Sequence, residues 1–274
     1  MKLDDVKKLH QKKYRAQLGY YLVEGEHLVL ELQKAELKKV NAYKKAMGDT
    51  EANSVKLFVT EEYEEWANQL NANFSIFTVN KKQMAQMSDT KNPQGIVACV
   101  PLPHLSSEYG TNNQVIEKPK TGAANGLNKT ERCVYLHEVQ DPGNLGTILR
   151  TLAWFGHFRL LLSPNSVDPF NPKVVRSSMG AIFHVPIELD VELSELQTRF
   201  KRFAYLDMQG NKVNAKEFAN YDCYLFGNEA RGVPSDALAT FDADPFTIPG
   251  SGSIDSLNLA SAVNICVYQL SMEL

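Results

Sequence analysis

Short apolar runs alternate with helically spaced segments over residues 20–101 of this 274-residue chain. The apolar runs are brief and rich in β-branched and aromatic residues, a pattern typical of buried strands. Strands are therefore expected at 55–60, 74–79 and 95–100. Helices are expected from Glu26 to Lys39, over 61–70 and over 81–87. The pattern predicts a small α/β unit that ends near Pro101 and Pro103.

The same alternation returns beyond residue 131. Strands are expected at 132–139, 159–163, 185–189, 202–208, 222–227 and 245–249. Helices are expected from Leu145 to Phe155, from Lys173 to Ile182 and from Ser256 to Leu270. Strands that alternate with helices predict a mainly parallel sheet covered on both faces, with its ligand at the carboxyl ends of the strands.

A polar stretch separates the two patterns. Residues 104–130 are rich in Gly, Asn, Ser and Thr and follow neither the period of a strand nor that of a helix. A structureless stretch of this length inside one compact domain is improbable, so it is interpreted as a linker. The predicted organisation is a first domain at 1–103, a linker at 104–130 and a second domain at 131–274.

The charges are distributed unevenly. Lys and Arg number 29 against 32 Asp and Glu, a net charge of -3 that on its own argues against a nucleic-acid partner. Residues 1–45, however, hold eleven basic and six acidic residues, which gives +5 and leaves -8 for the rest. This basic arm is compatible with RNA binding; a solvated helix face is the alternative.

The remaining composition excludes several classes. Four cysteines, at positions 99, 133, 223 and 266, are widely spaced among apolar neighbours, so neither a zinc site nor a disulfide framework is expected. The charged N-terminus lacks the apolar core of a signal peptide, and no stretch approaches the roughly 18 apolar residues of a membrane span. The expected location is the cytoplasm, with no membrane partner.

Three segments place glycines and polar residues directly after apolar runs. In the first segment (141–150), Asn144 is a candidate helix N-cap and Arg150 lies one to two turns into the helix. Arg150 alone would more often form a surface ion pair. The second segment (225–234) carries Gly227, Asn228, Glu229, Arg231 and Gly232, where Glu229 and Arg231 could simply pair with each other.

The third segment (248–258) is a glycine-loosened loop. Asp255 or Ser256 could cap the last helix, and Ser256 and Asn258 would then lie near its first turn. Asp255 stands where a dinucleotide-binding motif needs its third glycine, and the chain has no GK[ST]. A Rossmann-type nucleotide enzyme is therefore disfavoured.

Taken together and in this order, the three segments resemble the signature motifs of the SpoU family of RNA methyltransferases, within the SPOUT superfamily. The matching residues are Asn144, Gly146 and Arg150, then Gly227, Glu229 and Gly232, then Ile248, Pro249, Ser256, Leu257 and Asn258. The stretch from Arg176 through Gly180 resembles a further family segment. More weakly, Tyr21 to Gly25 resembles the start of the ribosomal-protein-like RNA-binding domain that precedes the catalytic domain in many members.

The resemblance implies an α/β trefoil-knot methyltransferase domain preceded by a small α/β RNA-binding domain. It implies methyl transfer from S-adenosylmethionine to a ribose 2'-hydroxyl of rRNA or tRNA, without a metal, by a homodimer whose site lies near its interface. The sequence does not choose between rRNA and tRNA. The alternative from another class is a non-catalytic RNA-binding or ribosome-assembly protein that retains the fold.

By the same resemblance, each motif residue acquires an expected role. Cofactor contacts are expected at Gly227, Ile248 and Leu257, with Leu206, Asn228 and Pro249 as neighbours. Arg150 is assigned to the hydroxyl or to an adjacent phosphate, since a guanidinium stays protonated and makes a weak base. The residues expected to orient Arg150 and the ribose are Asn144, Glu229, Ser256 and Asn258.

Overall fold

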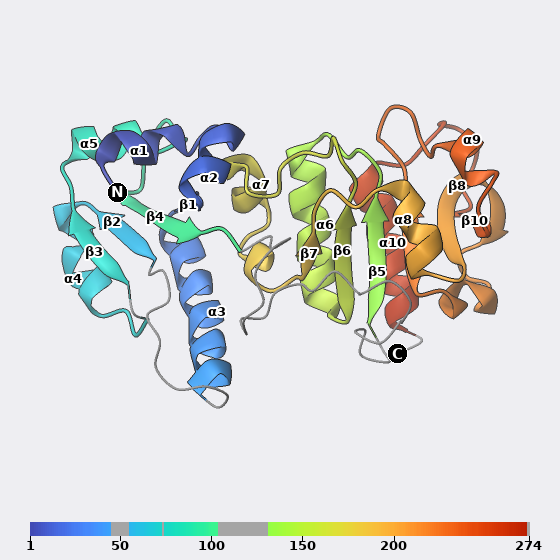
Figure 1. Cartoon of the computed structure of the whole chain (residues 1–274), viewed down its shortest axis with the longest axis horizontal. Helices are drawn as coiled ribbons and strands as arrows, with labels where there is room; N and C mark the ends of the chain where they lie inside the picture. The colour runs from blue at the N-terminus through green and yellow to red at the C-terminus, as the bar shows by residue number, and fades with distance from the viewer. Residues whose placement is uncertain (45–54, 73, 104–130, 273–274) are drawn as a thin grey trace. The chain divides into compact units, whose positions relative to one another are not determined.

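A computed structural model describes residues 1–44, 55–72, 74–103 and 131–272 (Figure 1). The chain forms two compact units: unit 1 comprises Met1–Leu105 with Asp168–His184, and unit 2 comprises Ser106–Val167 with Val185–Leu274. Each unit contains a sheet and helices, so the predicted α/β class is confirmed. The proposed linker at 104–130 lies outside the described residues, and the boundaries at 103 and 131 stay a prediction.

Unit 1 is built on a four-stranded sheet in the order β1-β4-β2-β3. Its strands are β1 (Tyr20–Glu24), β2 (Lys56–Val59), β3 (Ser75–Thr78) and β4 (Ile96–Pro101). Only β2 and β3 run parallel; β4 is antiparallel to both β1 and β2. The helices are α1 (Leu3–Lys8), α2 (Lys12–Leu18), α3 (Glu26–Lys44), α4 (Glu64–Asn68), α5 (Lys81–Met87) and α7 (Pro172–Ser177), with 3-10 turns η1 (Glu61–Tyr63) and η2 (Ala181–Phe183).

The core of unit 1 forms between this sheet and two short helices. Val6 and Leu9 of the α1 region and Met84 and Met87 of α5 are buried in one apolar cluster, which includes the strand residues Leu22, Phe58, Val97 and Cys99. The three predicted strands are confirmed, and each of their ends lies within one residue of the prediction. The single helix expected over 61–70 is wrong, because the chain there forms η1 followed by the short α4.

The first part of the basic arm (residues 1–45) forms α1 and α2, and part of its charge is neutralised within the protein. Lys7 pairs with Asp4 at 3.2 Å and Lys8 with Asp5 at 3.4 Å. Arg15 is only 3% exposed. Its guanidinium donates to Asp168 and to the carbonyl oxygens of Leu9 and His10. The count of +5 therefore overstates the basic surface, since burial and pairing remove Arg15 from it.

Arg15 also explains why Asp168–His184 belongs to unit 1. A carboxylate buried beside a guanidinium is strongly held, because removing either partner would leave an uncompensated charge. The rings of Tyr21 and Phe170 pack with centroids 4.9 Å apart, and Arg176 pairs with Asp89 at 2.8 Å. This segment, which joins two strands of the second sheet in sequence, is thus anchored by a buried ion pair, an aromatic contact and a surface ion pair.

Unit 2 is built on a six-stranded sheet in the order β10-β8-β9-β5-β6-β7. Its strands are β5 (Arg132–Leu136), β6 (Phe158–Leu162), β7 (Ile187–Glu188), β8 (Phe203–Lys212), β9 (Cys223–Phe226) and β10 (Ala243–Thr247). Every pairing between these named strands is parallel, as predicted. The helices are α6 (Pro142–Phe155), α8 (Leu193–Arg199), α9 (Ser235–Leu238) and α10 (Leu259–Ser271), with a 3-10 turn η3 (Lys216–Asn220).

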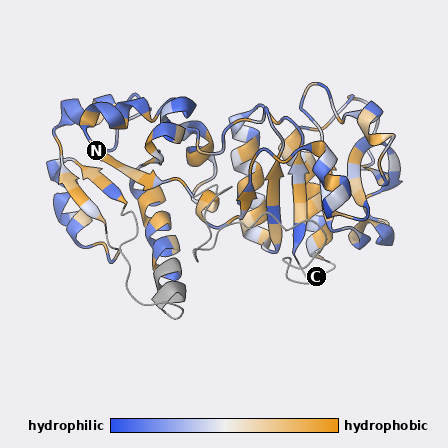
Figure 2. Cartoon of the chain, in the orientation of Figure 1, coloured by the Kyte–Doolittle hydropathy of each residue, from blue (hydrophilic) through white to orange (hydrophobic). Residues whose placement is uncertain are grey.

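Alternation along the buried strands supplies both faces of this sheet. Cys133 and Tyr135 of β5 share an apolar cluster with Leu196 of α8 and Leu238 of α9. Side chains of successive strand residues point to opposite faces, so Leu136 lies on the other face, where α6 packs on β6 and α10 packs on α6. Figure 2 shows the strands of both units as mainly hydrophobic and the helices as mixed.

Four predicted helices differ from the structure at a boundary. Helix α3 ends at Lys44 and not at Lys39. Helix α6 begins at Pro142 because Asp141, not Asn144, is its N-cap and accepts from the Asn144 N–H at 2.7 Å. The helix expected from Lys173 ends at Ser177, since the chain turns left-handed at Met179 and Gly180. Helix α10 begins at Leu259, and its cap is Asn258 rather than Asp255 or Ser256.

The four cysteines are free and buried. No helix in the described ranges is long and apolar enough to cross a membrane. Across the same described part of the chain, no group of three or more His, Cys, Asp or Glu side chains is placed to hold a metal ion.

Candidate functional site

The three polar segments meet at the carboxyl edge of the sheet of unit 2. Strands β5 and β9 are neighbours, with Leu136 opposite Phe226, and each is followed directly by a loop. Strand β8 adjoins β9 on its other side, and β10 adjoins β8. The first segment follows β5, the second follows β9 and the third follows β10. Parallel strands therefore bring together residues that are more than a hundred positions apart in the sequence.

The second segment is a tight hairpin whose glycines are required by packing. Asn228 and Gly232 exchange backbone hydrogen bonds of 2.9 Å in each direction. A Cβ placed on Gly227 would overlap the carbonyl group of Gly232, and Gly232 has a φ of +69°. Only glycine suits both conditions, because the first position has no room for a side chain and the second has a left-handed backbone.

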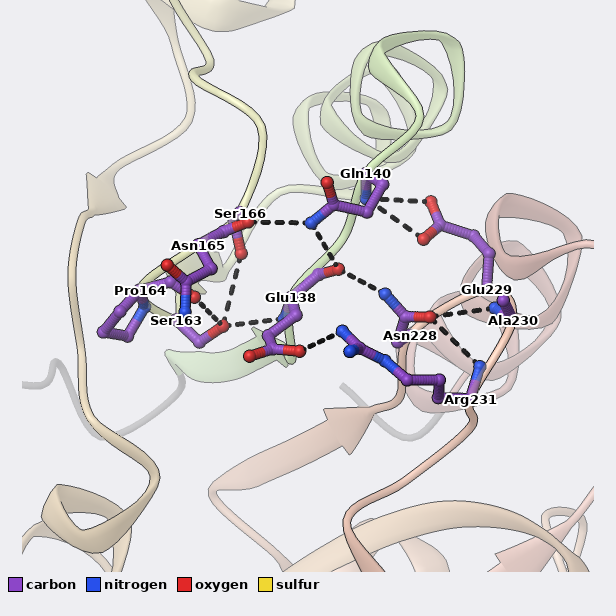
Figure 3. Close-up of polar contacts among 10 residues, drawn as sticks. All are labelled: Glu138, Gln140, Ser163, Pro164, Asn165, Ser166, Asn228, Glu229, Ala230 and Arg231. Carbon is purple, nitrogen blue, oxygen red and sulfur yellow. Dashed lines mark hydrogen bonds and ion pairs between the residues drawn. The ribbon is translucent and has the colours of Figure 1, made fainter.

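Asn228 is buried and holds this hairpin together (Figure 3). Its side-chain oxygen accepts from the N–H groups of Ala230 at 2.9 Å and Arg231 at 3.1 Å. Its amide nitrogen donates to the carbonyl oxygen of Glu138 at 2.6 Å. Because its backbone N–H and carbonyl oxygen are also bonded to Gly232, this predicted cofactor neighbour is engaged within the protein through both its side chain and its backbone.

Glu229 joins the second segment to the first. Its carboxylate accepts from the backbone N–H groups of Gln140 at 3.0 Å and Asp141 at 3.1 Å, and from the Asn144 amide at 3.2 Å. The alternative that Glu229 pairs with Arg231 is not what the structure shows, because Arg231 instead pairs with Glu138. Glu229 therefore fixes the start of α6 relative to the hairpin.

Asn258 joins the third segment to the same group. Its amide nitrogen donates to the side-chain oxygen of Asn144 at 2.9 Å, and its own oxygen caps α10 through the Ser261 N–H at 3.2 Å. The resulting chain, which we call the Asn–Asn–Glu relay, runs from Asn258 through Asn144 to Glu229. One hydrogen-bonded line thus connects all three polar segments.

Arg150 and Ser256 are not part of this line. Both are exposed, and no hydrogen bond or ion pair of either side chain is formed with another described residue. Arg150 lies on an exposed stripe of α6 with Thr147 and Trp154, at the i, i+3, i+7 spacing of one helix face. Its guanidinium is therefore free to bind an external group.

The expected cofactor residues lie on β8 and on the loops that follow β9 and β10. Leu206 and Ile248 are partly buried, whereas Pro249 is exposed and Leu257 is 47% exposed. Two further large apolar side chains on the same stretches, Met208 and Ile254, are also exposed. These stretches therefore present backbone groups beside uncovered apolar surface, which suits a ligand with both polar and apolar parts.

Glu138 is a feature of the site that the sequence did not indicate. Its backbone has a φ of +50°, which costs a non-glycine residue about 1–3 kcal/mol. Ser163 Oγ accepts from its N–H at 2.7 Å, and the Gln140 amide donates to its carbonyl at 3.1 Å. Its carboxylate pairs with Arg231, but a largely exposed pair contributes only about 0–1 kcal/mol. The pair by itself does not offset the strain.

His137, next to Glu138, also went unnoticed in the sequence. Burial lowers its pKa, and Arg231 lowers it further, while Glu138 acts in the opposite direction. Its buried Nδ1 atom has no hydrogen-bond partner among the described residues. A lone histidine after an apolar run gives no recognisable signal; only its place at the strand end singles it out.

Comparison with known proteins matches the chain to two family models. Residues 131–268 match the SpoU rRNA methylase family, and residues 2–98 match the MRM3-like substrate-binding domain. The 23S rRNA (guanosine(2553)-2'-O)-methyltransferase RlmP of Bacillus subtilis (strain 168) is 28% identical over 98% of this chain and 95% of its own length. An uncharacterized tRNA/rRNA methyltransferase of Synechocystis sp. is 31% identical over 96% of this chain and 88% of its own length.

The fold is shared with solved SpoU methyltransferases. The enzyme AviRb of Streptomyces viridochromogenes, solved in complex with the cofactor AdoMet, superposes with a TM-score of 0.77 over 99% of this chain and 97% of its own, at 20% sequence identity. Because the match covers 99% of this chain, it includes residues of both units.

Proposed function

The chain belongs to the SpoU rRNA methylase family, and from that membership we propose that it transfers a methyl group from S-adenosylmethionine to a ribose 2'-hydroxyl of ribosomal RNA. The relative RlmP, which this chain matches over 95% of its length, is named as a 2'-O-methyltransferase of 23S rRNA. The observation that carries the proposal is the Asn–Asn–Glu relay, since it links one residue from each of the three motifs at the carboxyl edge of the sheet.

S-adenosylmethionine supplies a methyl group already activated on a sulfonium. The residues that would hold it are Gly227, Ile248 and Leu257, with Leu206, Asn228 and Pro249 as neighbours. They fit such a ligand because the apolar side chains of Leu257, Met208 and Ile254 are uncovered on β8 and on the loop that follows β10. We infer that the trefoil knot of the family is present around these loops.

The work left to the protein is orientation and handling of one proton. Arg150 is proposed to bind the ribose hydroxyl or an adjacent phosphate through its planar guanidinium, because its donors form no hydrogen bond with another described residue. Asn144, Asn258 and Glu229 would fix the ribose and the motif loops, and Ser256 lies exposed beside Asn258 to add a further hydroxyl. Metal ligands are not needed for this chemistry.

We also propose that the chain works as a homodimer. Trp154 on α6 is 84% exposed, and Ile265, Tyr268 and Met272 form a neighbouring exposed apolar stripe on α10. The two helices are joined by a hydrogen bond from Thr151 to Asn264 and by the rings of Phe155 and Tyr268. An uncovered apolar surface of this kind indicates an interface. Arg150 shares the α6 stripe with Trp154, so a second copy would receive it near its own site.

Sedimentation equilibrium tests the dimer. The wild-type chain is expected to sediment at twice its mass of 30.7 kDa, and Trp154→Glu to sediment as a monomer because a charge would be buried at the interface. Phe77→Glu, which alters an exposed aromatic residue on β3, is the matched control and should stay dimeric. A monomeric wild type would refute the proposal.

Unit 1 is proposed to bind the RNA substrate. Its match to a substrate-binding domain and the exposed Lys12 and Lys13 of α2 support this role. Ribosomal RNA is favoured over transfer RNA because the matched family and the relative RlmP are named for it. A cytoplasmic location, where bacterial ribosomes assemble, belongs to the same proposal.

The direct test is transfer of label from S-adenosylmethionine to unmodified 16S rRNA, 23S rRNA and tRNA transcribed in vitro, followed by mapping of 2'-O-methyl sites. One rRNA nucleotide is expected to be modified. Modification of tRNA alone would show that the substrate is transfer RNA and not ribosomal RNA. If calorimetry showed RNA binding without any S-adenosylmethionine binding, the chain would be a non-catalytic RNA-binding protein that keeps the fold.

A further inference from the structure

We propose that Arg231 is a further RNA-binding residue of this site, held by Glu138 in position to meet a phosphate of the substrate. This inference rests on the proposed function, because it concerns how the same site grips its RNA. Neither residue belongs to the motif positions from which roles were inferred. The two lie on different loops, after β5 and after β9, and their side chains meet between those loops (Figure 3).

Arg231 is anchored at both ends. At its base, its backbone N–H donates to the side chain of Asn228 at 3.1 Å. At its tip, one guanidinium nitrogen, Nη2, donates to the Glu138 carboxylate. A long side chain that is already restrained loses less conformational freedom when it binds a ligand than a mobile surface arginine does. The guanidinium is thus pre-positioned.

Most of its donors nevertheless point to no protein partner. A guanidinium has five N–H donors, and among the described residues neither Nε nor Nη1 of Arg231 forms a hydrogen bond. The side chain is 69% exposed, whereas that of Glu138 is 24% exposed. Glu138 therefore engages Nη2 of the guanidinium and leaves Nε and Nη1 open to solvent.

Glu138 in turn is fixed by three hydrogen bonds to its backbone. Ser163 receives its N–H, while Asn228 and Gln140 donate to its carbonyl oxygen. They hold it in the left-handed conformation that directs its carboxylate to Arg231. Because strain of this kind concentrates at functional sites, a restraint on Arg231 accounts for the arrangement better than loop fastening alone.

The position of Arg231 suits a phosphate. It lies two residues after Glu229, which is hydrogen-bonded to the start of α6 and to Asn144. An RNA ribose that enters the site brings a phosphate on each side of it. The open edge of a guanidinium matches phosphate oxygens in both charge and geometry. The class of ligand is therefore the RNA backbone, read without regard to base.

The test compares the wild type with Arg231→Gln, Arg231→Lys and, as a matched control, Lys216→Gln, which removes an exposed cation on η3. Filter binding to 23S rRNA transcribed in vitro is measured at several KCl concentrations, together with S-adenosylmethionine binding and thermal melting. For Arg231→Gln we expect a dissociation constant for RNA raised about tenfold. The slope of log K against log salt should fall by about 0.7–1. Arg231→Lys should keep the slope and bind less tightly than the wild type.

Two results would overturn the proposal. One is an unchanged RNA affinity and salt slope in Arg231→Gln. The other is a lowered melting temperature with equal loss of S-adenosylmethionine binding, which would identify the pair as a loop fastener. A wild type that binds RNA and transfers no methyl group would count against the methyltransferase function alone, since the effect of Arg231 on RNA binding stays measurable.

Discussion

Replacing Arg150 with Ala is expected to slow methyl transfer about 10²- to 10³-fold, the usual cost of removing one donor aimed at the reacting group. The fall should lie in kcat at saturating S-adenosylmethionine, because Arg150 is exposed and forms no hydrogen bond or ion pair with the described residues of the loops proposed to bind the cofactor. The checking measurement is single-turnover transfer of labelled methyl to rRNA.

Two further variants sharpen this expectation. Arg150→Lys keeps the charge without the planar fork and should recover only part of the rate. Lys216→Ala, an exposed cation away from the carboxyl edge, should behave as wild type. Equal rates in Arg150→Ala and wild type would remove Arg150 from the catalytic assignment, whatever the fate of the methyltransferase proposal.

Replacing Glu229 with Gln is expected to lower activity about 10- to 100-fold, because charge-assisted hydrogen bonds of about 1.5–3 kcal/mol lose their acceptor charge. An amide offers one oxygen where the carboxylate offers two, and its NH₂ group would face the N–H donors of Gln140 and Asp141. The start of α6 and Asn144 would then lose their fixed position. Steady-state kinetics with rRNA measures the fall.

The matched control is Glu217→Gln, which removes the same charge from η3, before the amino end of β9, and should leave activity unchanged. If the activity of Glu229→Gln equalled that of Glu217→Gln, the Asn–Asn–Glu relay would have no part in catalysis. Mixing the impaired Glu229→Gln chains with the impaired Arg150→Ala chains tests in addition whether Arg150 acts across the dimer interface. If the partner's Arg150 completes each site, random dimers should regain about a quarter of wild-type activity. No recovery would place Arg150 in its own chain's site.

The sequence predicted the fold class because burial leaves a local trace. The runs around Val134 and Leu225 are continuously apolar, as parallel strands covered on both faces must be. The second segment predicted a tight loop for a similar reason: Gly227 and Gly232 are each required by backbone geometry at their own position. Helix boundaries were less predictable, because Asp141 and Asn144 are both competent caps and Pro142 decided between them.

Pairing between distant residues left no such trace. Glu229 had a candidate partner, Arg231, in its own segment, yet it bonds to Gln140, Asp141 and Asn144, about ninety positions earlier. Arg15 was counted with the basic arm, although its charge is neutralised by Asp168 far along the chain. The strained Glu138 carried no signal at all, since Glu is not a residue that predicts a left-handed backbone.

The sequence by itself thus determined which segments are strands, which loops follow them and which residue types those loops offer, because side-chain period and glycine placement are local properties of the chain. Tertiary structure alone decided which of those residues meet. The parallel order β10-β8-β9-β5 brings three loops to one edge of the sheet. There Asn258, Asn144 and Glu229 are linked by hydrogen bonds, and Arg231 forms an ion pair with Glu138. Such contacts depend on strand order and register, which are set by the packing of the whole sheet and not by any one segment.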